Sequence, residues 1–298
     1  MIQILSIDHI RERIDDAAVI DRMRQALMAQ SRGECDTPMP MHLSTGTLEK
    51  PGGEVHMKSS YRRGGKYFAL KMASTFGGVG NGMMMLASAE TGEPVALLED
   101  AGHLTDVRTA AVAAMVAREL GREDRTIGIL GSGIQARLTA RFYKRVLPLE
   151  RVVLWGRTAE RVEDCAREIE KFAAVTIAKS PAEVAASARL IVTCTASHEA
   201  LLKQRDLLDG FHISAVGADS VGKRELDPEI LRRADLILAD SMAQCAKLGE
   251  LQHAPDQVTR AIEIGSFCEA PRAVKSSVAD FTGLGVEDLF IAEMIYTK

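Results

Sequence analysis

A glycine-rich turn at residues 131–136 lies between two regular patterns in the sequence. The stretch "TIGIL" before it is typical of a buried strand, and "IQARLTARFYKRV" after it has the periodicity of a helix. Gly131 permits a tight turn, Gly133 lets backbone approach a pyrophosphate, and Ala136 lets helix and strand pack closely. The N–H groups at the helix start then face the phosphates. This context favours a dinucleotide site over a purely conformational turn, and its predicted contacts are Gly131, Ser132, Gly133, Ile134, Gln135 and Ala136.

The end of the next predicted strand indicates which dinucleotide binds. A site for NAD(H) usually has Asp or Glu there, about 20 residues after the glycines, to bind the ribose 2′-hydroxyl. This chain instead reads "VVLWGRTAER", with Arg157 and Thr158 at that point. A guanidinium and a hydroxyl suit a 2′-phosphate, so NADP(H) is favoured, with NAD(H) as the alternative. In a second interpretation Arg157 is a solvated surface residue and Thr158 only caps the following helix.

A second group of charged residues predicts a site for a small carboxylate. Arg108 falls in the first turn of a helix predicted at 104–120, where the helix dipole disfavours a cation by roughly 0.3–1 kcal/mol. A bound anion would offset that cost, and a substrate carboxylate could lie where the helix start and the guanidinium converge. The alternative is that Arg108 pairs with Asp106 or Asp100 on a solvated surface.

Lys71 and Asp219 are the candidates for proton transfer. Lys71 stands in the apolar stretch "YFALKMAST", and a partly desolvated ammonium has a lowered pKa suited to that task. Because Lys71 alternates with Ala69 and Ala73, an outward, solvated lysine is the alternative. Asp219 comes just after a predicted strand, at the edge where open α/β sheets place ligands, although it could equally cap the following turn.

The elements that must position these residues form two kinds of pattern. Residues 10–29 have helical periodicity, and 36–100 contain short segments separated by glycine turns, as in antiparallel strands. From residue 126 onward, strand-like runs such as "RVVLW", "LIVTCT" and "HISAVG" alternate with helical stretches, which predicts a mostly parallel sheet with helices on both faces. The final amphipathic segment, "GVEDLFIAEMIYTK", could pack on the first part of the chain. The predicted fold is α/β: a Rossmann dinucleotide-binding domain plus a smaller α+β domain.

Composition excludes several classes of function. The 298 residues carry a net charge of −4 without a long basic run, which argues against nucleic acid as a partner. Charges within the first dozen residues and the lack of an 18-residue apolar run predict neither a signal peptide nor a membrane segment, so we expect a cytoplasmic protein. The five cysteines are widely spaced and lack a CxxC pair, so the sequence predicts no disulfide framework and no metal site.

Taken together, these stretches resemble the ornithine cyclodeaminase and mu-crystallin family over nearly the whole chain. The resemblance lies in "FALKMAST", "LLEDAGHLTDVRTAAVAA", "IGILGSGIQARL", "VGADSVGKRELDPEILRRAD" and "DFTGLGVEDL", which occur in the family's order. It implies a substrate and dimerisation domain at 1–121, completed by about 281–298, and a Rossmann domain at 122–280. It also implies a homodimer whose first-domain sheets join into a closed barrel.

The resemblance also implies roles for individual residues. Lys71 and Arg108 match the family's ligands of the substrate carboxylate, and Asp219 matches its acid/base aspartate beside the substrate amine. The predicted cofactor contacts further include Thr109, Thr195 and Gly283.

The chain departs from the family at two places. Members commonly have an arginine in the segment matching "CDTPMPMHLS", but none occurs between Arg32 and Arg62. His56 stands where ornithine-cyclising members have a glutamate for the distal amine, which argues against ornithine as the substrate. Lys58, on the same strand face as His56, could take over the missing anion contact. Within the family, "GEVHMKSSY" most resembles a branch linked with ectoine breakdown.

These residues predict reversible hydride transfer between NADP(H) and the α-carbon of an α-amino or cyclic imino acid. Arg108, Lys71 and Lys58 would hold the carboxylate, and Asp219 would exchange a proton with the nitrogen. One alternative is a cyclodeaminase, a lyase that oxidises a diamino acid, expels ammonia and returns the hydride to the ring. A third is a non-enzymatic NADPH-binding protein, which a fold resemblance alone does not exclude.

Overall fold

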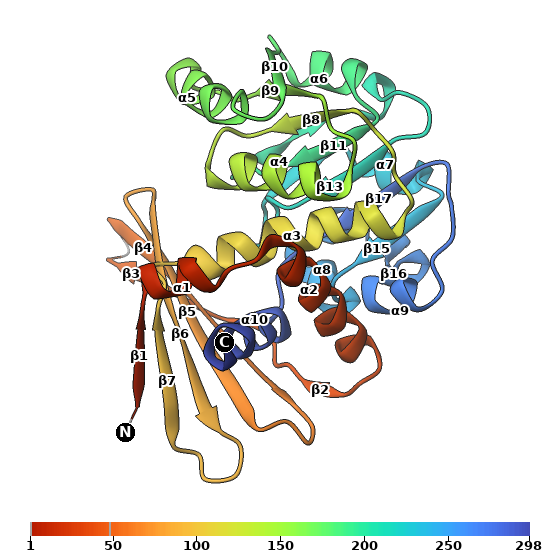
Figure 1. The fold of residues 1–298 in the computed structure, drawn as a ribbon. Coiled ribbons are helices and arrows are strands. Elements are labelled where there is room, and N and C mark those ends of the chain that lie inside the picture. Colours follow the sequence, from red (N-terminus) through yellow and green to blue (C-terminus); the bar gives the residue numbers. More distant parts are fainter. Residues whose placement is uncertain (1, 48) are drawn as a thin grey trace. The chain divides into compact units, whose positions relative to one another are not determined.

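The computed structural model describes residues 2–47 and 49–298 and divides the chain into two compact units (Figure 1). The first unit, Met1–Arg108 with Leu284–Lys298, is called the sheet unit below, and the second, Thr109–Gly283, the Rossmann unit. The boundary falls inside helix α3 (His103–Glu119), so that helix contributes its beginning to one unit and the remainder to the other. Each unit is described by itself.

The sheet unit is built on one seven-stranded sheet. Its order is β1-β7-β6-β5-β4-β2, with β3 also paired to β4, and all neighbours are antiparallel except β1 and β7. The antiparallel strands predicted for 36–100 are therefore confirmed. The strands are β1 (Gln3–Ser6), β2 (Cys35–Asp36), β3 (Met41–Gly46), β4 (Pro51–Arg62), β5 (Tyr67–Phe76), β6 (Val79–Ser88) and β7 (Pro94–Glu99).

The N-terminal helical segment differs from the prediction. Instead of one helix over 10–29, the chain forms α1 (Ile7–Arg13) and α2 (Asp16–Ser31). The break has a local cause, because the Asp15 carboxylate accepts a hydrogen bond from the Ala18 N–H at 2.8 Å and so caps a new helix. Because the apolar periodicity continues through the break, the sequence pattern did not indicate that one helix ends there and another begins.

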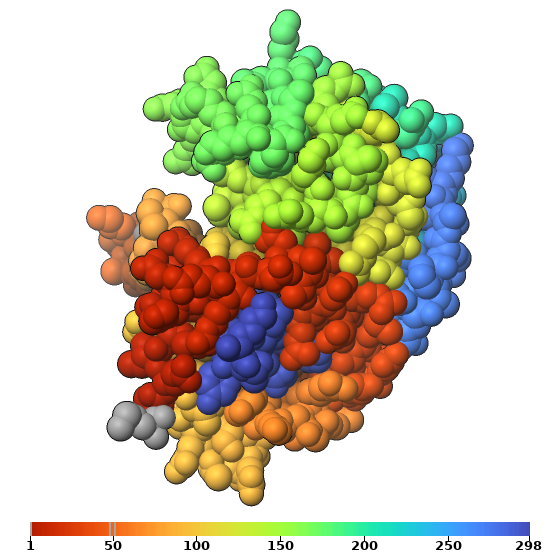
Figure 2. Space-filling model, viewed as in Figure 1, coloured from red at the N-terminus to blue at the C-terminus, as the bar shows by residue number. Residues whose placement is uncertain are grey.

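The C-terminal helix α10 (Gly285–Thr297) packs within the sheet unit, against α2 and strands β4, β5 and β6. Figure 2 shows its blue surface bordered by the red surface of the N-terminal helices. The predicted packing on the first part of the chain is confirmed, but the predicted amphipathic character is wrong. Residues 285–292 are all buried, because α10 is covered by the sheet on one side and by α2 on another. A helix enclosed in this way needs no polar face.

The Rossmann unit contains an eight-stranded, wholly parallel sheet in the order β10-β9-β8-β11-β13-β17-β15-β16. The parallel sheet predicted from the alternating pattern is confirmed. The last long strand, β17, inserts between β13 and β15. The strands are β8 (Thr126–Leu130), β9 (Arg151–Trp155), β10 (Ala174–Ile177), β11 (Leu190–Thr193), β13 (His212–Ala215), β15 (Leu236–Ala239), β16 (Ile262–Glu263) and β17 (Ser277–Asp280), with β12 (His198–Leu202) and β14 (Arg224–Leu226) in a separate pair.

Helices follow most of these strands, as the connection of parallel neighbours requires. Buried side chains of the sheet, such as Leu130, Ile191, Ile213 and Val278, form one apolar cluster with residues of the helices. Among the described residues, no helix is both long and apolar enough to span a membrane. The helices are α4 (Ile134–Val146), α5 (Ala159–Ile169), α6 (Pro181–Ser187), α7 (Pro228–Arg233), α8 (Met242–Leu248) and α9 (Ile264–Glu269), with short 3-10 turns at Gln204–Asp206, Glu250–His253 and Pro255–Arg260.

Candidate functional site

The glycine turn of the Rossmann unit joins the end of β8 to the start of α4. Gly131 has φ +129°, a region that residues with a side chain rarely adopt, and a Cβ there would lie 2.6 Å from Cys194 Sγ. This first glycine is therefore required by the protein's own backbone. Ala136 is fully buried, as expected for the small residue that lets helix and strand pack closely.

Gly133 has no such internal reason to be glycine. Its φ is −83°, and a Cβ built on it would meet no atom of the chain within 4 Å. It is the N-cap of α4, where no side chain caps the helix and no acidic residue occurs in the first turn. The open space over Gly133 and the helix start of α4, which no side chain caps, together fit an approaching anionic group such as a pyrophosphate.

A cleft of about 300 Å³ opens at this turn, along the carboxyl ends of β8, β9 and β11. Six of the residues predicted to contact a dinucleotide line it: Gly131, Ser132, Gly133, Arg157, Thr158 and Thr195. Ile134, Gln135, Ala136, Thr109 and Gly283 are not among its lining residues. The carboxyl edge of a parallel sheet is where ligands bind in this architecture.

The part of the cleft beyond β9 is positively charged. Arg157 and Arg161 both line it and both are exposed, whereas the lining contains no Asp or Glu. Thr158 is the N-cap of α5, yet its side chain makes no capping hydrogen bond. The sequence reasoning missed Arg161, although its position four residues after Arg157 places both near the start of one helix.

Buried carboxylates fix two loops of this unit. Glu225 accepts hydrogen bonds from Thr195 N–H (2.6 Å), Thr195 Oγ1 (2.7 Å) and Gly217 N–H (3.0 Å). Burial raises the pKa of Glu225, and these hydrogen bonds oppose that shift. Asp240 likewise accepts from the N–H groups of Thr282 and Gly283, each at 2.6 Å. Thr195 and Gly283 are thus held by partners that the sequence did not reveal.

Four charged side chains meet in the sheet unit: Lys71, Arg108, Glu287 and Asp288. Arg108 donates from Nη1 to Glu287 Oε2 at 2.9 Å and from Nε to Asp288 Oδ1 at 3.3 Å. Lys71 Nζ lies 3.7 Å from Asp288 Oδ2. All four side chains are at most 5% exposed. The two cations predicted to hold a substrate carboxylate are thereby brought together, beside two carboxylates of α10.

Two expectations about these cations are wrong. Arg108 is the sixth residue of α3, in its second turn, because the helix already begins at His103, and Asp100 accepts the Leu104 N–H at 2.8 Å. Arg108 pairs with Glu287 and Asp288 in a buried cluster, so the expected position on a solvated surface is wrong. The outward, solvated orientation considered for Lys71 is also wrong, since its strand face is buried and Leu70 and Met72 face outward.

Lys71 has an unusual acidity for a lysine. Burial lowers its pKa to about 8, an effect that Asp288 opposes and that Lys58 and Arg108 reinforce. Lys58 lies directly opposite Lys71 on the neighbouring strand, and His56 lies opposite Ala73. His56, Lys58 and Lys71 therefore share one face of the sheet, as predicted for the first two.

Asp219 belongs to the Rossmann unit and follows β13 by four residues. Its carboxylate accepts hydrogen bonds from Lys223 Nζ at 2.6 Å and from Ser220 Oγ at 3.1 Å, and its side chain is 45% exposed. This side chain is accessible to a ligand and can accept a proton, while its role as acid or base stays a prediction.

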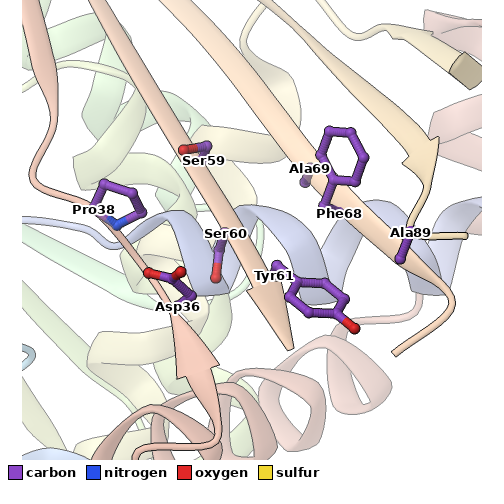
Figure 3. A pocket seen from close by; sticks show the side chains of 8 residues that line it. All are labelled: Asp36, Pro38, Ser59, Ser60, Tyr61, Phe68, Ala69 and Ala89. Carbon is purple, nitrogen blue, oxygen red and sulfur yellow. The ribbon is translucent and has the colours of Figure 1, made fainter. Parts of the chain in front are cut away.

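A separate cavity of about 310 Å³ lies in the sheet unit, near the carboxyl end of β4 (Figure 3). Asp36, Ser60, Tyr61 and Phe68 are among the residues that line it. The Ser60 hydroxyl lies 2.7 Å from Thr37 Oγ1 and is so engaged within the protein. None of the predicted site residues lines this cavity, and we assign it no part in the reaction.

Comparison with known proteins agrees with this architecture. A cyclodeaminase of Sinorhizobium fredii, itself described as uncharacterised, is 35% identical over an alignment of 266 residues that covers 83% of this chain and 80% of that protein. A delta(1)-pyrroline-2-carboxylate reductase of Bacillus cereus is 32% identical over 73% of this chain and 71% of its own length. The solved structure of the Thermococcus litoralis delta(1)-pyrroline-2-carboxylate reductase, in complex with NADH and L-proline, has a TM-score of 0.90, with 22% identity over 99% of this chain and 97% of that one.

The last of these likenesses concerns the fold, whereas the first two concern the sequence itself. The sequence signature of the ornithine cyclodeaminase/mu-crystallin family matches residues 81–298, which include α3, the whole Rossmann unit and α10. This chain therefore belongs to the ornithine cyclodeaminase/mu-crystallin family.

Proposed function

We propose that the protein is an NAD(P)H-dependent oxidoreductase that interconverts an α-imino acid and the corresponding α-amino acid. The observation that supports this most is the cleft at Gly133, where a glycine without an internal role faces uncapped helix N–H groups. A nicotinamide dinucleotide bound there would supply or accept the hydride. The reductase that resembles this chain acts, by its name, on pyrroline-2-carboxylate, a cyclic imino acid.

NADP(H) is the proposed cofactor, in preference to NAD(H). Arg157 and Arg161 provide two guanidinium groups, and no carboxylate in the cleft would repel a 2′-phosphate. The Thr158 hydroxyl, which makes no capping bond, adds a donor. The related reductase structure contains NADH, so the preference of this chain has to be measured directly.

The variant Arg157→Asp tests the cofactor proposal. We expect its ratio of kcat/KM for NADPH to that for NADH to fall by about a hundredfold, because a charge-assisted contact is replaced by repulsion. Arg205→Asp is the matched control, since Arg205 is exposed and lies outside the cleft lining. An unchanged ratio in Arg157→Asp would show that this arginine does not bind the 2′-phosphate.

Lys71 and Arg108 are the proposed ligands of the substrate carboxylate. At 3.7 Å from Asp288, the Lys71 ammonium is beyond hydrogen-bond distance of that carboxylate and keeps donors for a substrate oxygen. Lys58 extends the same sheet face and would contact the substrate further along, and His56 lies beyond Lys58 on that face. Asp288 and Glu287 hold the two cations in place and balance their charge before a substrate arrives.

Asp219 is the proposed proton-exchange group. An imine accepts a hydride best when its nitrogen is protonated, and hydride transfer to that protonated imine yields a neutral amine that keeps the proton. The carboxylate would keep the proton on nitrogen while the C=N bond becomes C–NH, and Lys223 would hold the carboxylate in position. In the reverse direction the same group would accept the proton.

A cyclodeaminase is the second candidate, favoured by the 35% identical relative that bears this name. The two activities differ in their net redox change, because a cyclodeaminase releases ammonia without net consumption of the nicotinamide cofactor. His56, in place of a glutamate that would bind a distal amine, favours the reductase. Ammonia release from a diamino acid at constant NADPH absorbance would reverse this preference.

A homodimer formed through the sheet unit is also proposed. One face of the sheet carries exposed apolar side chains, called the apolar outer face: Ile4, Met41, Leu43, Leu70, Met72 and Met83. Met83, Met72, Met57 and Met41 lie in register across β6, β5, β4 and β3. A continuous apolar patch of this kind is typical of a surface that a second copy covers.

The decisive assay follows NADPH absorbance with purified protein and a set of imino acids. The set comprises pyrroline-2-carboxylate, piperideine-2-carboxylate, iminosuccinate and pyruvate with amines. We expect one of them to be reduced with saturation kinetics. Tight NADPH binding without turnover on any of them would instead support a non-enzymatic binding protein.

A further inference from the structure

Two histidines and one glutamate converge on the sheet unit outside the buried charge cluster. His42 of β3 lies directly opposite His56 of β4, and Glu54 precedes His56 by two residues on the same strand face. The Nε2 atoms of His42 and His56 lie 4.0 Å and 3.8 Å from the same carboxylate oxygen, Glu54 Oε2. One ligand atom from each residue lies within 4.8 Å of the other two.

The ring geometry leaves both imidazoles able to serve one central ion. The ring centroids are 4.6 Å apart and the planes are inclined by 44°, so the rings are not stacked face to face. With metal–ligand bonds of about 2.0–2.2 Å, two ligands of a tetrahedral ion lie about 3.4 Å apart. The observed 3.8 Å and 4.0 Å separations need only a small inward movement of side chains that are 26–56% exposed.

We propose that His42, Glu54 and His56 form a binding site for one divalent transition-metal ion of the zinc type. Two neutral imidazole nitrogens and one carboxylate oxygen suit Zn²⁺, Ni²⁺ or Cu²⁺, whereas Mg²⁺ and Ca²⁺ prefer oxygen ligands alone. Three protein ligands leave at least one coordination position for water or a small molecule. This site could not be predicted from residue spacing, because the ligands are brought together by the register of β3 on β4.

The surroundings of the cluster limit how tightly the ion binds. Lys58 follows His56 by two residues on the same strand face and opposes a second positive charge there. The Glu54 carboxylate compensates for it, so we expect micromolar rather than tighter affinity. Within the described part of the chain, β3 pairs with β4 alone. An ion bound by residues of both strands would therefore fix β3 in place and stabilise the sheet unit.

Isothermal titration of the chelator-treated, full-length protein with Zn²⁺ tests this proposal. We expect one ion per chain and a melting temperature that rises by a few degrees when Zn²⁺ is added. His42→Ala and Glu54→Gln should each weaken Zn²⁺ binding about tenfold or more, as loss of a ligand requires. His9→Ala is the matched control, because His9 is an exposed histidine whose Nδ1 lies 3.2 Å from Ser6 Oγ, and it should leave binding unchanged.

A second measurement keeps the test independent of the variants' folding and of any redox activity. In wild-type protein, Zn²⁺ should shift the side-chain nitrogen NMR signals of His42 and His56 and leave that of His198 in place. Absence of saturable binding would overturn the proposal. So would unchanged affinity in His42→Ala, which would place the ion elsewhere, for example on a cysteine. The heat of titration and the NMR signals report on metal binding alone. Failure of the proposed reductase activity would therefore not affect this result.

Discussion

At the scale of single residues, Lys71 connects the buried charge cluster to the proposed chemistry. Its pKa is lowered to about 8, so its ammonium form is fully present only below that pH. Binding of a substrate carboxylate requires this charged form. We therefore expect kcat/KM for the imino acid to fall about tenfold per pH unit above pH 8, mainly through a rise in KM.

Lys71→Arg is the variant that checks this pH dependence. A guanidinium stays charged throughout the accessible pH range, so the fall above pH 8 should disappear even if the overall activity is lower. Steady-state kinetics between pH 6 and 10 on both proteins would measure the difference. A wild-type profile that is flat to pH 10, or an equal fall in both proteins, would contradict the role assigned to Lys71.

Residue type alone predicted part of the site. Lys71 and Arg108 stood out because a lysine in an apolar strand and an arginine early in a helix are costly without a partner. Their partners Glu287 and Asp288 could not be found in this way, because they lie about 180 positions along the chain from Arg108. Glu225 was missed for a similar reason, since its contact with Thr195 depends on how β11 and β14 are placed.

At the scale of elements, alanine substitutions of two glycines at helix starts should have different effects on stability and on cofactor binding. A Cβ on Gly285 would lie 2.3 Å from the backbone oxygen of Ser59, so α10 would have to move away from β4. We expect Gly285→Ala to lower the free energy of unfolding by about 1–3 kcal/mol. Thermal or denaturant unfolding measures this change.

Gly133→Ala is the matched variant, because its Cβ enters open space. It should cost at most about 1 kcal/mol of stability, the difference between glycine and alanine as an N-cap. NADPH binding, in contrast, should weaken about tenfold or more, since the methyl group occupies the path of the pyrophosphate. Equal effects of the two variants on stability, or unchanged NADPH affinity in Gly133→Ala, would disprove the distinction.

Whether the sequence predicted a given strand or helix correctly depended on how deeply that element is buried. Strands β8, β9 and β11 were predicted because buried parallel strands are continuous apolar runs bounded by glycine or polar residues. The short strands β2 and β16 and the mostly exposed β3 lack such runs, so the sequence did not single them out as individual strands. The end of α1 was missed because its apolar spacing continues into α2 across the break at Asp15.

At the scale of the whole molecule, the apolar outer face predicts an assembly. Met72→Lys places a charge in the middle of the methionine row that crosses four strands. We expect this variant to be a monomer and the wild type a dimer in size-exclusion chromatography with light scattering. Ile177→Lys is the control, since Ile177 is similarly exposed but lies on the edge strand β10 of the Rossmann unit. A monomeric wild type, or a dimer that survives Met72→Lys, would rule out this interface.

At this scale the sequence predicted the type of sheet in each unit, but it placed the boundary between the two units at a different residue. Alternation of strands and helices indicated the parallel sheet, and glycine turns indicated the antiparallel one. The expected boundary at residue 121 follows the end of a helix, whereas the compact units divide within α3, after Arg108. Helical periodicity carries no information on which unit each turn of α3 packs against, so that division needed the structure.

The central claim is that this chain transfers a hydride between a nicotinamide cofactor and the α-carbon of an imino acid. The most direct measurement uses NADPH deuterated at both C4 positions, the best imino acid substrate and mass spectrometry of the amino acid formed. We predict a single deuteron on the α-carbon and loss of the transfer in Arg108→Met. A product without deuterium, or labelled NADPH that stays unconsumed while ammonia is released, would contradict the account.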